Sequence, residues 1–288
     1  MGLLGKVKRY LKSISLKKEA VDNPVLYGRL LKGRAALVTG GTSGIGLAIA
    51  EAYARNGAAV VVTGRSEERM EKALEAVRQK VDGARVAGIV LDSSTGDEDA
   101  FVRALDRAES ELGMPLDILV NNAGVIAGGS VPDTRMDGFD LTIDTNLRGA
   151  YFLSQAFARR MVCAKRESNI LNVCSSSSLR PAISPYTVSK WGLRGMTMGF
   201  AKALIPHGIV VNGLAPGPTA TPMLMGDGDG NLVNEGVPAG RYATPEEIAN
   251  MAVVLVSDLS RMVVGDIVYM TGGCGNLTFD DMNYSVRF

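Results

Sequence analysis

A glycine-rich turn between a buried strand and a helix constrains the fold of this chain more than any other feature. The run Gly40-Gly41-Thr42-Ser43-Gly44-Ile45-Gly46 follows an apolar strand at 35–39 and leads into a helical run at 47–56 that stops at Gly57. Glycines let the backbone approach a ligand closely, and a helix N-terminus presents unpaired N–H groups and a positive dipole end. The order strand, glycine turn, helix therefore predicts a site for the pyrophosphate of a dinucleotide.

Alternating apolar and helical runs continue along the rest of the chain. We expect strands at 58–63, 85–91, 116–120, 169–174, 209–214 and 266–270, and helices at 67–80, 98–112, 139–161, 186–204 and 248–257. Parallel strands need crossover connections, which are usually helical and right-handed. The chain is therefore expected to adopt an α/β fold of the Rossmann type: a doubly wound, seven-stranded parallel sheet with helices on both faces, in a single domain over 33–275.

The end of the second strand indicates which dinucleotide binds. This strand ends at Gly64-Arg65, and residues 58–64 contain no acid. An Asp or Glu at this point accepts a hydrogen bond from the ribose 2′-hydroxyl, whereas an Arg pairs with a 2′-phosphate. NADP(H) is therefore preferred over NAD(H), which remains the alternative because Arg65 can instead stack on adenine or stay solvated.

A tyrosine and a lysine four residues apart follow the turn-prone segment 181–185. On a helix, Tyr186 and Lys190 lie on one face. A cation held beside a phenol favours release of the phenolic proton, so the pair is suited to acid–base work near neutral pH. By itself, this spacing is also typical of an exposed helix without function.

Polar residues stand at the carboxyl ends of two further strands, the edge where open parallel sheets bind ligands. Asp92 ends the strand at 85–91, and Asn121-Asn122-Ala123-Gly124 ends the strand at 116–120. Asn146 lies in an otherwise apolar helix. An unpaired amide there would be costly, so Asn146 either satisfies backbone groups or holds a water.

Composition excludes several classes of function. The net charge of +1 gives no sign of a nucleic-acid partner, and three widely spaced cysteines predict neither a disulfide framework nor a metal site. His207 is the only histidine, which argues against Ser-His hydrolases and multi-histidine metal sites. No apolar run has the length of a membrane span, and the N-terminus lacks a signal-peptide core, so we expect a cytoplasmic protein.

The two ends of the chain and one glycine-rich segment differ from the rest. Residues 1–34 hold nine Lys/Arg against two acids, and residues 3–18 have the spacing of a basic amphipathic helix. We expect residues 1–32 to form an arm that packs on another subunit, stays disordered or makes weak contact with a membrane surface. Residues 219–240 are expected to be a flap over a site, and residues 276–288 a tail that packs on a neighbouring subunit.

Six motifs in this order resemble those of the short-chain dehydrogenases/reductases, and the resemblance covers about residues 33–275. They are Thr39-Gly40-(x)3-Gly44-Ile45-Gly46, Asn121-Asn122-Ala123-Gly124, Asn146, the serine run at 175–178, Tyr186-(x)3-Lys190 and Pro216-Gly217. Residues 241–248 and the closing Gly272-Gly273 look nearest to bacterial 3-oxoacyl-acyl-carrier-protein reductases. The resemblance implies an NAD(P)-dependent oxidoreductase that reduces a carbonyl to a secondary alcohol, or the reverse.

The resemblance also implies a role for each matched residue. Tyr186 would be the general acid in reduction, Lys190 would assist it and hold the nicotinamide ribose, and a serine would bind the substrate oxygen. Asn146 would place a water that links Lys190 to solvent. Contacts to the cofactor would come from Gly40, Thr42, Ser43, Gly44, Ile45, Gly46, Arg65, Asp92, Asn121, Ala123, Gly124, Tyr186, Lys190, Pro216, Gly217, Thr219 and Thr221.

The serine is the one place where the chain departs from the family pattern. Ser175 occupies the matching position after the fifth strand, but its interval to Tyr186 is shorter than is usual in the family. A shortened loop explains the difference, and we expect Ser175 to be the catalytic serine, with Ser176 and Ser177 as alternatives.

The substrate is not fixed by these motifs. We expect a small-molecule carbonyl or alcohol, with a 3-oxoacyl thioester first and a keto sugar or a steroid as alternatives. A non-catalytic, cofactor-sensing protein on the same fold is the runner-up, since fold does not determine function. The resemblance further implies a homo-oligomer, a tetramer or a dimer.

Overall fold

The computed structural model describes residues 29–225, 232–275 and 277. Its strands are β1 (Ala35–Val38), β2 (Ala59–Gly64), β3 (Val86–Val90), β4 (Ile118–Asn121), β5 (Ser168–Val173), β6 (Ile209–Pro216) and β7 (Ile267–Met270). Its α-helices are α2 (Gly44–Arg55), α3 (Glu67–Lys80), α4 (Glu98–Leu112), α5 (Met136–Ile143), α6 (Gly149–Ala164), α7 (Pro185–Leu204), α8 (Pro222–Met225) and α9 (Pro245–Val256).

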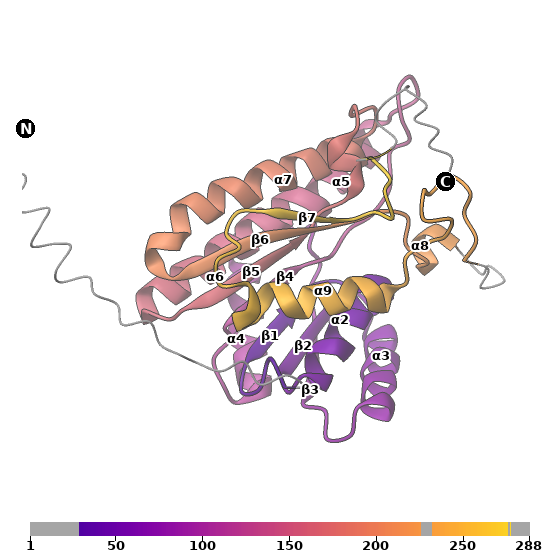
Figure 1. Ribbon diagram of the computed structural model, residues 1–288. Helices are drawn as coiled ribbons and strands as arrows, with labels where there is room; N and C mark the ends of the chain where they lie inside the picture. The colour runs from indigo at the N-terminus through magenta and orange to yellow at the C-terminus, as the bar shows by residue number, and fades with distance from the viewer. Residues whose placement is uncertain (1–28, 226–231, 276, 278–288) are drawn as a thin grey trace, which may run out of the picture.

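The seven strands form one sheet in the order β3-β2-β1-β4-β5-β6-β7, and every neighbouring pair is parallel (Figure 1). From β1 the chain first builds outward to β3, then returns to place β4 on the other side of β1. This reversal creates a crevice at the carboxyl ends of β1 and β4, where such sheets bind ligands. The predicted doubly wound, seven-stranded parallel sheet is confirmed.

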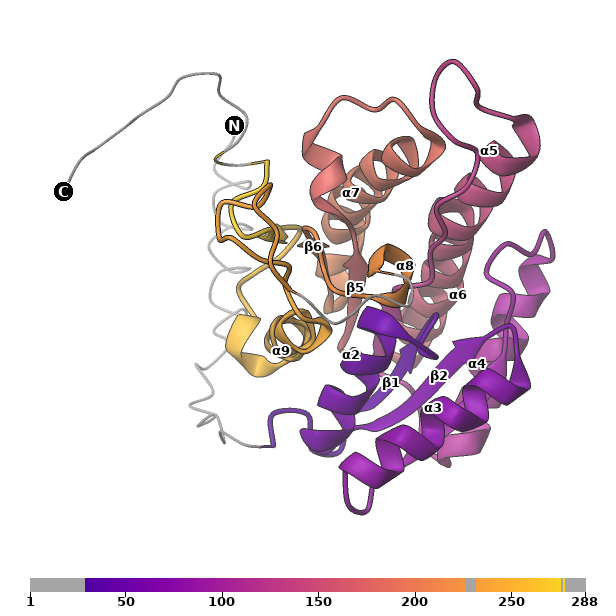
Figure 2. The same ribbon diagram turned by 90° about the vertical axis from the view of Figure 1, so that its right-hand side faces the viewer.

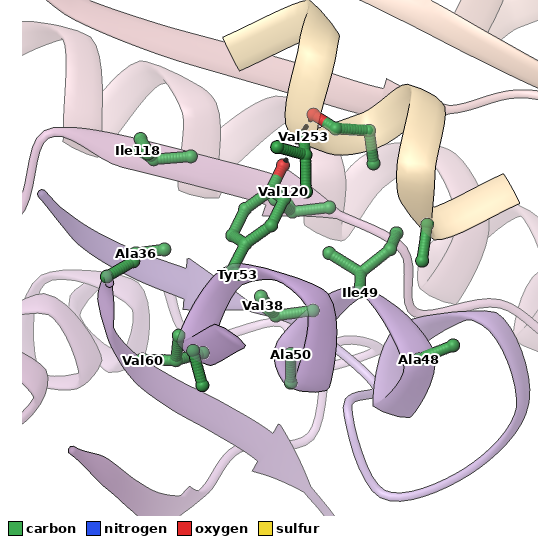
Figure 3. Packing of buried hydrophobic residues seen from close by; sticks show 14 of the residues in the cluster. Ala36, Val38, Ala48, Ile49, Ala50, Tyr53, Val60, Ile118, Val120 and Val253 are labelled. Atoms are coloured by element: carbon green, nitrogen blue, oxygen red, sulfur yellow. Dashed lines mark hydrogen bonds between the residues drawn. The ribbon is translucent and has the colours of Figure 1, made fainter. Parts of the chain in front are cut away.

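Helices cover both faces of the sheet, as Figure 2 shows. Alternate strand residues point to opposite faces. Val38 and Val60 belong to a core cluster with α2, α3 and α9, whereas Leu37 and Val61 belong to a second cluster with α4 and α6. In Figure 3, Tyr53 extends from α2 across the first cluster toward α9, where its hydroxyl donates to Ala252 O at 3.1 Å.

Helix boundaries follow capping residues in the sequence. Helices α3 and α4 begin and end where the sequence predicts, at 67–80 and 98–112, after Ser66 and Asp97, whose side chains accept backbone N–H bonds. Helices α7 and α9 each begin with a proline behind a capping box, at Ser184 and Thr244.

The single helix expected at 139–161 is interrupted in the structure. A π-helical turn, η1 (Asp144–Arg148), separates α5 from α6. The Asn146 amide in this turn binds the Val125 backbone, and Gly149, the first residue of α6, lies so close to another loop that a Cβ there would be 2.0 Å from Ser93 O. The contacts that shape this turn are therefore tertiary, which explains why helical periodicity did not reveal it.

The core includes residues close to the start of the described chain. Leu31 is fully buried, and its N–H donates to Asn56 O at 3.1 Å. The amphipathic segment expected at 3–18 and nearly all of the tail at 276–288 lie outside the described residues. Within the part that the structure describes, no helix is both long and apolar enough to span a membrane, and no group of His, Cys, Asp and Glu is arranged to hold a metal ion.

Candidate active site

A cavity of about 900 Å³ opens at the carboxyl edge of the sheet and is lined by residues that follow β1 to β6. It brings together nearly all the site residues expected from the sequence: Gly40, Thr42, Ser43, Gly44, Ile45, Gly46, Arg65, Asp92, Ala123, Gly124, Ser175, Tyr186, Lys190, Pro216, Gly217, Thr219 and Thr221. Two expected residues, Asn121 and Asn146, do not line the cavity but are buried beneath its wall.

The N-terminus of α2 faces this cavity without a cap of its own. Ser43 makes no side-chain capping bond, and the first turn of α2 contains no acid. By contrast, α3, α4 and α9 each have a side-chain cap and acids in the first turn. The first N–H groups of α2 and its positive dipole end are therefore left for an external anion, and they fit the pyrophosphate of a dinucleotide.

Glycine is required where α2 meets the neighbouring loops. A Cβ on Gly46 would lie 2.3 Å from Asn122 Nδ2 and 2.4 Å from Gly40 O, so no side chain can replace it without moving the backbone. A Cβ on Gly44, whose φ is +55°, would meet the Thr221 side chain at 3.4 Å. The loop after β6 therefore packs directly on the start of α2 and leaves the cradle open on its ligand side.

Two residues that sequence reasoning did not assign to the site connect the ends of β1 and β4. Thr39 Oγ1 accepts from the N–H groups of Asn122 at 2.9 Å and Ala123 at 3.0 Å, and donates to Val120 O at 3.2 Å. The Asn122 side chain donates in return to Thr39 O at 2.8 Å and Gly40 O at 3.1 Å. The sequence offered a signal for both residues: Thr39 directly precedes the glycine turn, and Asn122 belongs to the Asn-Asn-Ala-Gly run.

Charged residues gather at the end of the cavity beside β2 and β3. Arg65 and Asp92 line it as expected, and Arg69, in the first turn of α3, lines it too although no sequence motif indicated it. Burial opposes the charged form of Asp92, but hydrogen bonds from Ser94 and the charge of Arg65 outweigh it and lower the pKa of the carboxyl. Asp92 thus stays ionised near the Arg65 guanidinium.

Tyr186 and Lys190 lie on the same side of α7 and both line the cavity. Lys190 Nζ is 5.6 Å from the centre of the Tyr186 ring and donates to Val173 O at 2.9 Å. Lys190 is buried, so this single bond to the end of β5 fixes where its charge sits. The geometry places a cation next to a phenol inside a ligand-sized cavity.

Asn146 holds the wall behind that pair. Its Oδ1 accepts from Val125 N at 2.8 Å, and its Nδ2 donates to Val125 O at 3.0 Å and to Ser189 Oγ at 3.1 Å. Ser189 Oγ in turn donates to Tyr186 O at 2.7 Å. The side chain therefore satisfies backbone groups, which is one of the two alternatives left open by the sequence.

Asn121 belongs to a buried polar chain between β4, β5 and the flanking helices. Its Nδ2 donates to Ser154 Oγ and Asn172 Oδ1, both at 2.8 Å, and Asn172 Nδ2 donates to Thr197 Oγ1 at 2.9 Å. Within the described residues, Asn121 Oδ1 has no hydrogen-bond partner. Asn121 thus supports the strand next to the cavity from behind, without reaching the cavity itself.

Three consecutive serines after β5 line the cavity. Ser175 comes first, and its Oγ accepts from Ser177 N at 3.0 Å as the short 3-10 turn η2 (Ser176–Leu179) begins. The preceding Cys174 is buried, and burial raises the pKa of its thiol to about 11 despite the nearby charge of Lys190. The choice among Ser175, Ser176 and Ser177 remains a prediction.

Comparison with known proteins shows the family to which this chain belongs. The family model described as short chain dehydrogenase matches residues 34–231. Gluconate 5-dehydrogenase from Gluconobacter oxydans is 36% identical over 259 residues, which cover 88% of this chain and 98% of that protein. The 3-oxoacyl-[acyl-carrier-protein] reductase of Chlamydia muridarum is 36% identical over 250 residues, covering 85% and 98%.

Solved structures agree with these sequence matches. The crystal structure of a short chain dehydrogenase from Burkholderia cenocepacia in complex with NADP superposes with a TM-score of 0.75 at 34% identity, covering 84% of this chain and 98% of that one. By sequence and by fold, this chain belongs to the short-chain dehydrogenase/reductase family and is an oxidoreductase.

Proposed function

We propose that the protein is an NADP(H)-dependent oxidoreductase that interconverts a ketone and a secondary alcohol, with Tyr186 as the proton donor in reduction. The observation that carries this proposal is the shared cavity: Tyr186 and Lys190 line the same space as the uncapped start of α2. A dinucleotide lying along the sheet edge would bring its reactive ring to the Tyr186 end.

The chemistry divides between the cofactor and the protein. When bound, the nicotinamide supplies or accepts the hydride, and the protein positions the substrate and moves a proton. The Tyr186 phenol holds the proton destined for the substrate oxygen. The Ser175 hydroxyl donates a hydrogen bond to the same oxygen, which fixes the carbonyl against the phenol.

Lys190 acts on the tyrosine and on the cofactor side of the cavity. One of its three N–H groups is used by Val173 O, and the other two are available to ribose hydroxyls and to the phenolate that remains after proton transfer. Because Lys190 is buried, its charge is weakly screened by water. The water that the family resemblance assigns to Asn146 would return the proton from solvent.

NADP(H) is the preferred cofactor in this proposal. Arg65 and Arg69 line the cavity beside β2, where the adenosine ribose would lie, and no acid stands in β2 or at its end to bind a 2′-hydroxyl. Guanidinium groups suit a phosphate, to which arginine donates two parallel hydrogen bonds.

The catalytic proposal is tested by following oxidation of NADPH and NADH with 3-oxoacyl thioester, keto-sugar, steroid and simple ketone substrates. We expect turnover with NADPH that falls by about a thousandfold in Tyr186→Phe, since general acid catalysis contributes roughly 10²–10⁴. Tight NADPH binding without turnover of any substrate, in wild type and variant alike, would instead favour the cofactor-sensing function.

The cofactor preference is tested separately with Arg65→Ala. Loss of charge-assisted bonds to a phosphate should raise the KM for NADPH about ten- to one-hundredfold and leave the KM for NADH nearly unchanged. An unchanged KM for NADPH would argue against a role for Arg65 at the 2′-phosphate.

A homo-oligomer remains part of the proposal. Apolar side chains of α6 and α7 are exposed on the isolated chain: Tyr151, Val188, Trp191 and Met198. Pairing of these helices between subunits would remove this surface from water. Light scattering coupled to size-exclusion chromatography measures the mass, and a monomer at micromolar concentration would contradict the expectation. We also retain the cytoplasm as the proposed location.

A further inference from the structure

We infer that Arg180 binds an anionic group of the substrate, so that the substrate is a small ketone or alcohol carrying a carboxylate or a phosphate. This inference rests on the proposed function, because it names the substrate class of the same site. Arg180 follows η2, lines the cavity together with Tyr186 and Ser175, and has an exposed side chain.

Arg180 is a cation that lines the same cavity as the proposed catalytic residues Ser175 and Tyr186. Within the described part of the chain, its guanidinium makes neither an ion pair nor a hydrogen bond to another side chain. Among the described residues, Asp92 is the one acid that lines the cavity, and it follows β3. Arg180 follows β5, and four strand spacings separate β3 from β5 in the sheet order, or about 19 Å at about 4.8 Å each. The charge of Asp92 therefore serves the adenosine end.

Other parts of the cavity are suited to bind the anionic groups of the cofactor. The start of α2 suits the pyrophosphate, and Arg65 with Arg69 suits the 2′-phosphate. Arg65 follows β2, three strand spacings from β5, or about 14 Å. Arg180 therefore lies on the side of the cavity that is left for the substrate.

The backbone that carries Arg180 is held rigidly from α7. Trp191 Nε1 donates to Arg180 O at 2.7 Å, and Arg194 donates to Ser178 O at 3.0 Å. The Arg194 guanidinium also lies 5.3 Å from the centre of the Trp191 ring. A guanidinium on an anchored backbone loses less conformational freedom when it binds a ligand.

Apolar side chains also line the cavity. Ile126, Met223 and Leu224 line the cavity, although each is more than half exposed in the described chain. A substrate seated there would place its carbon chain on these residues, its carbonyl at Tyr186 and a charged end at Arg180. Neutral steroids and simple ketones would leave the guanidinium without a partner.

Activity on a matched pair of ketones provides the first test. The pair is 5-keto-D-gluconate and L-sorbose, which has CH₂OH in place of the carboxylate. For Arg180→Met we expect kcat/KM for the keto acid to fall about ten- to one-hundredfold, mostly through KM, and that for L-sorbose to change less than about threefold. The control, Arg107→Met, removes an exposed arginine that does not line the cavity and should change neither. Equal losses for both ketones, or no loss for the acid, would overturn the inference.

A binding experiment separates this inference from the catalytic proposal. Trp191 is the only tryptophan, so its fluorescence reports on the loop that carries Arg180. We would titrate Tyr186→Phe, saturated with NADP, with D-gluconate, D-sorbitol 6-phosphate and D-sorbitol. The inference is supported if the fluorescence of Trp191 changes saturably with one or both anions but not with sorbitol, and if this change is absent in the double variant Tyr186→Phe, Arg180→Met. The same titrations show which anion is preferred.

The outcomes of the two tests are distinguishable. Arg180-dependent anion binding without turnover of any ketone by the wild type would leave the anion site standing and refute the catalytic proposal. Turnover that requires Tyr186 but is insensitive to Arg180→Met would support the catalytic proposal and refute the anion site. Failure of both anions to bind would refute the anion site.

Discussion

Replacing Asn146 with alanine should destabilise the protein as well as impair its activity. The side chain is almost fully buried and makes three hydrogen bonds, two to the Val125 backbone and one to Ser189. At about 1 kcal/mol net per bond the loss is about 3 kcal/mol. Val125 is only half-buried, so water can partly replace the lost partner and reduce the loss to about 2 kcal/mol.

Urea unfolding of the cofactor-free protein, at one fixed protein concentration, measures this difference. The matched control is Asn56→Ala, because Asn56 donates one side-chain hydrogen bond, to Ala52 O at 2.9 Å. We expect the control to lose no more than about 1 kcal/mol. If the Asn146→Ala variant has the same urea midpoint of unfolding as the wild type, the reasoning is refuted.

Activity alone cannot separate the two roles considered for Asn146. The bonds from Asn146 to Ser189 and from Ser189 to Tyr186 O support the turn that carries the phenol, so their loss should lower kcat. A water held for Lys190, as the family resemblance implies, would lower kcat as well. Only the structural support predicts that the cofactor-free protein also unfolds more easily, which is why stability is the deciding measurement.

Other predictions concern the cofactor cradle, a thiol and a capping box. Gly46→Ala would force a Cβ to within 2.4 Å of a backbone carbonyl, so KM for NADPH should rise about tenfold or more, whereas Gly96→Ala, with nothing within 4 Å, should leave it unchanged. Burial raises the pKa of Cys174 to about 11, so Ellman's reagent at pH 8 should titrate the exposed Cys163 and spare Cys174 until the protein unfolds. Hydrogen bonds from the Arg241 side chain and the Thr244 backbone N–H lower the pKa of Glu247 to about 2. The ionised carboxylate therefore stabilises the fold fully above its ordinary pKa of 4.5, and this stabilisation is lost as the pH falls through about 2. Because the pair is exposed, Glu247→Gln should cost less than about 1 kcal/mol at pH 7, and urea midpoints of the two proteins should converge on acidification; a constant gap down to pH 3 would contradict this.

The parallel sheet was predictable because each of its strands carries its own signal. Strands β1, β2 and β4 are short, buried and apolar, and turn residues bound them. Helices α3 and α4 have the expected bounds, and each begins directly after a capping side chain, Ser66 or Asp97. Sequence-local physics of this kind is independent of what the chain packs against, so it can be read without a structure.

The residues missed by sequence reasoning act through contacts across the fold. Asn122 binds Thr39 and Gly40, more than eighty positions away in the chain, and no local pattern records that pairing. Arg69 and Arg180 lie in segments that look like an ordinary helix and an ordinary loop. They become site residues only because the strand order brings their elements to one edge of the sheet.

The start of α2 has a feature that the sequence alone does not reveal, because Ser43 is of a residue type that usually caps a helix. Helices α3, α4 and α9 begin with a side-chain cap and acids that satisfy their first N–H groups. At the start of α2, Ser43 caps nothing and Gly44-Ile45-Gly46 supplies no acid. Unsatisfied N–H groups at a partly buried helix end cost free energy unless something binds them. An open helix start directly after a buried strand therefore points to an anionic ligand at α2, as the glycine-rich turn in the sequence does.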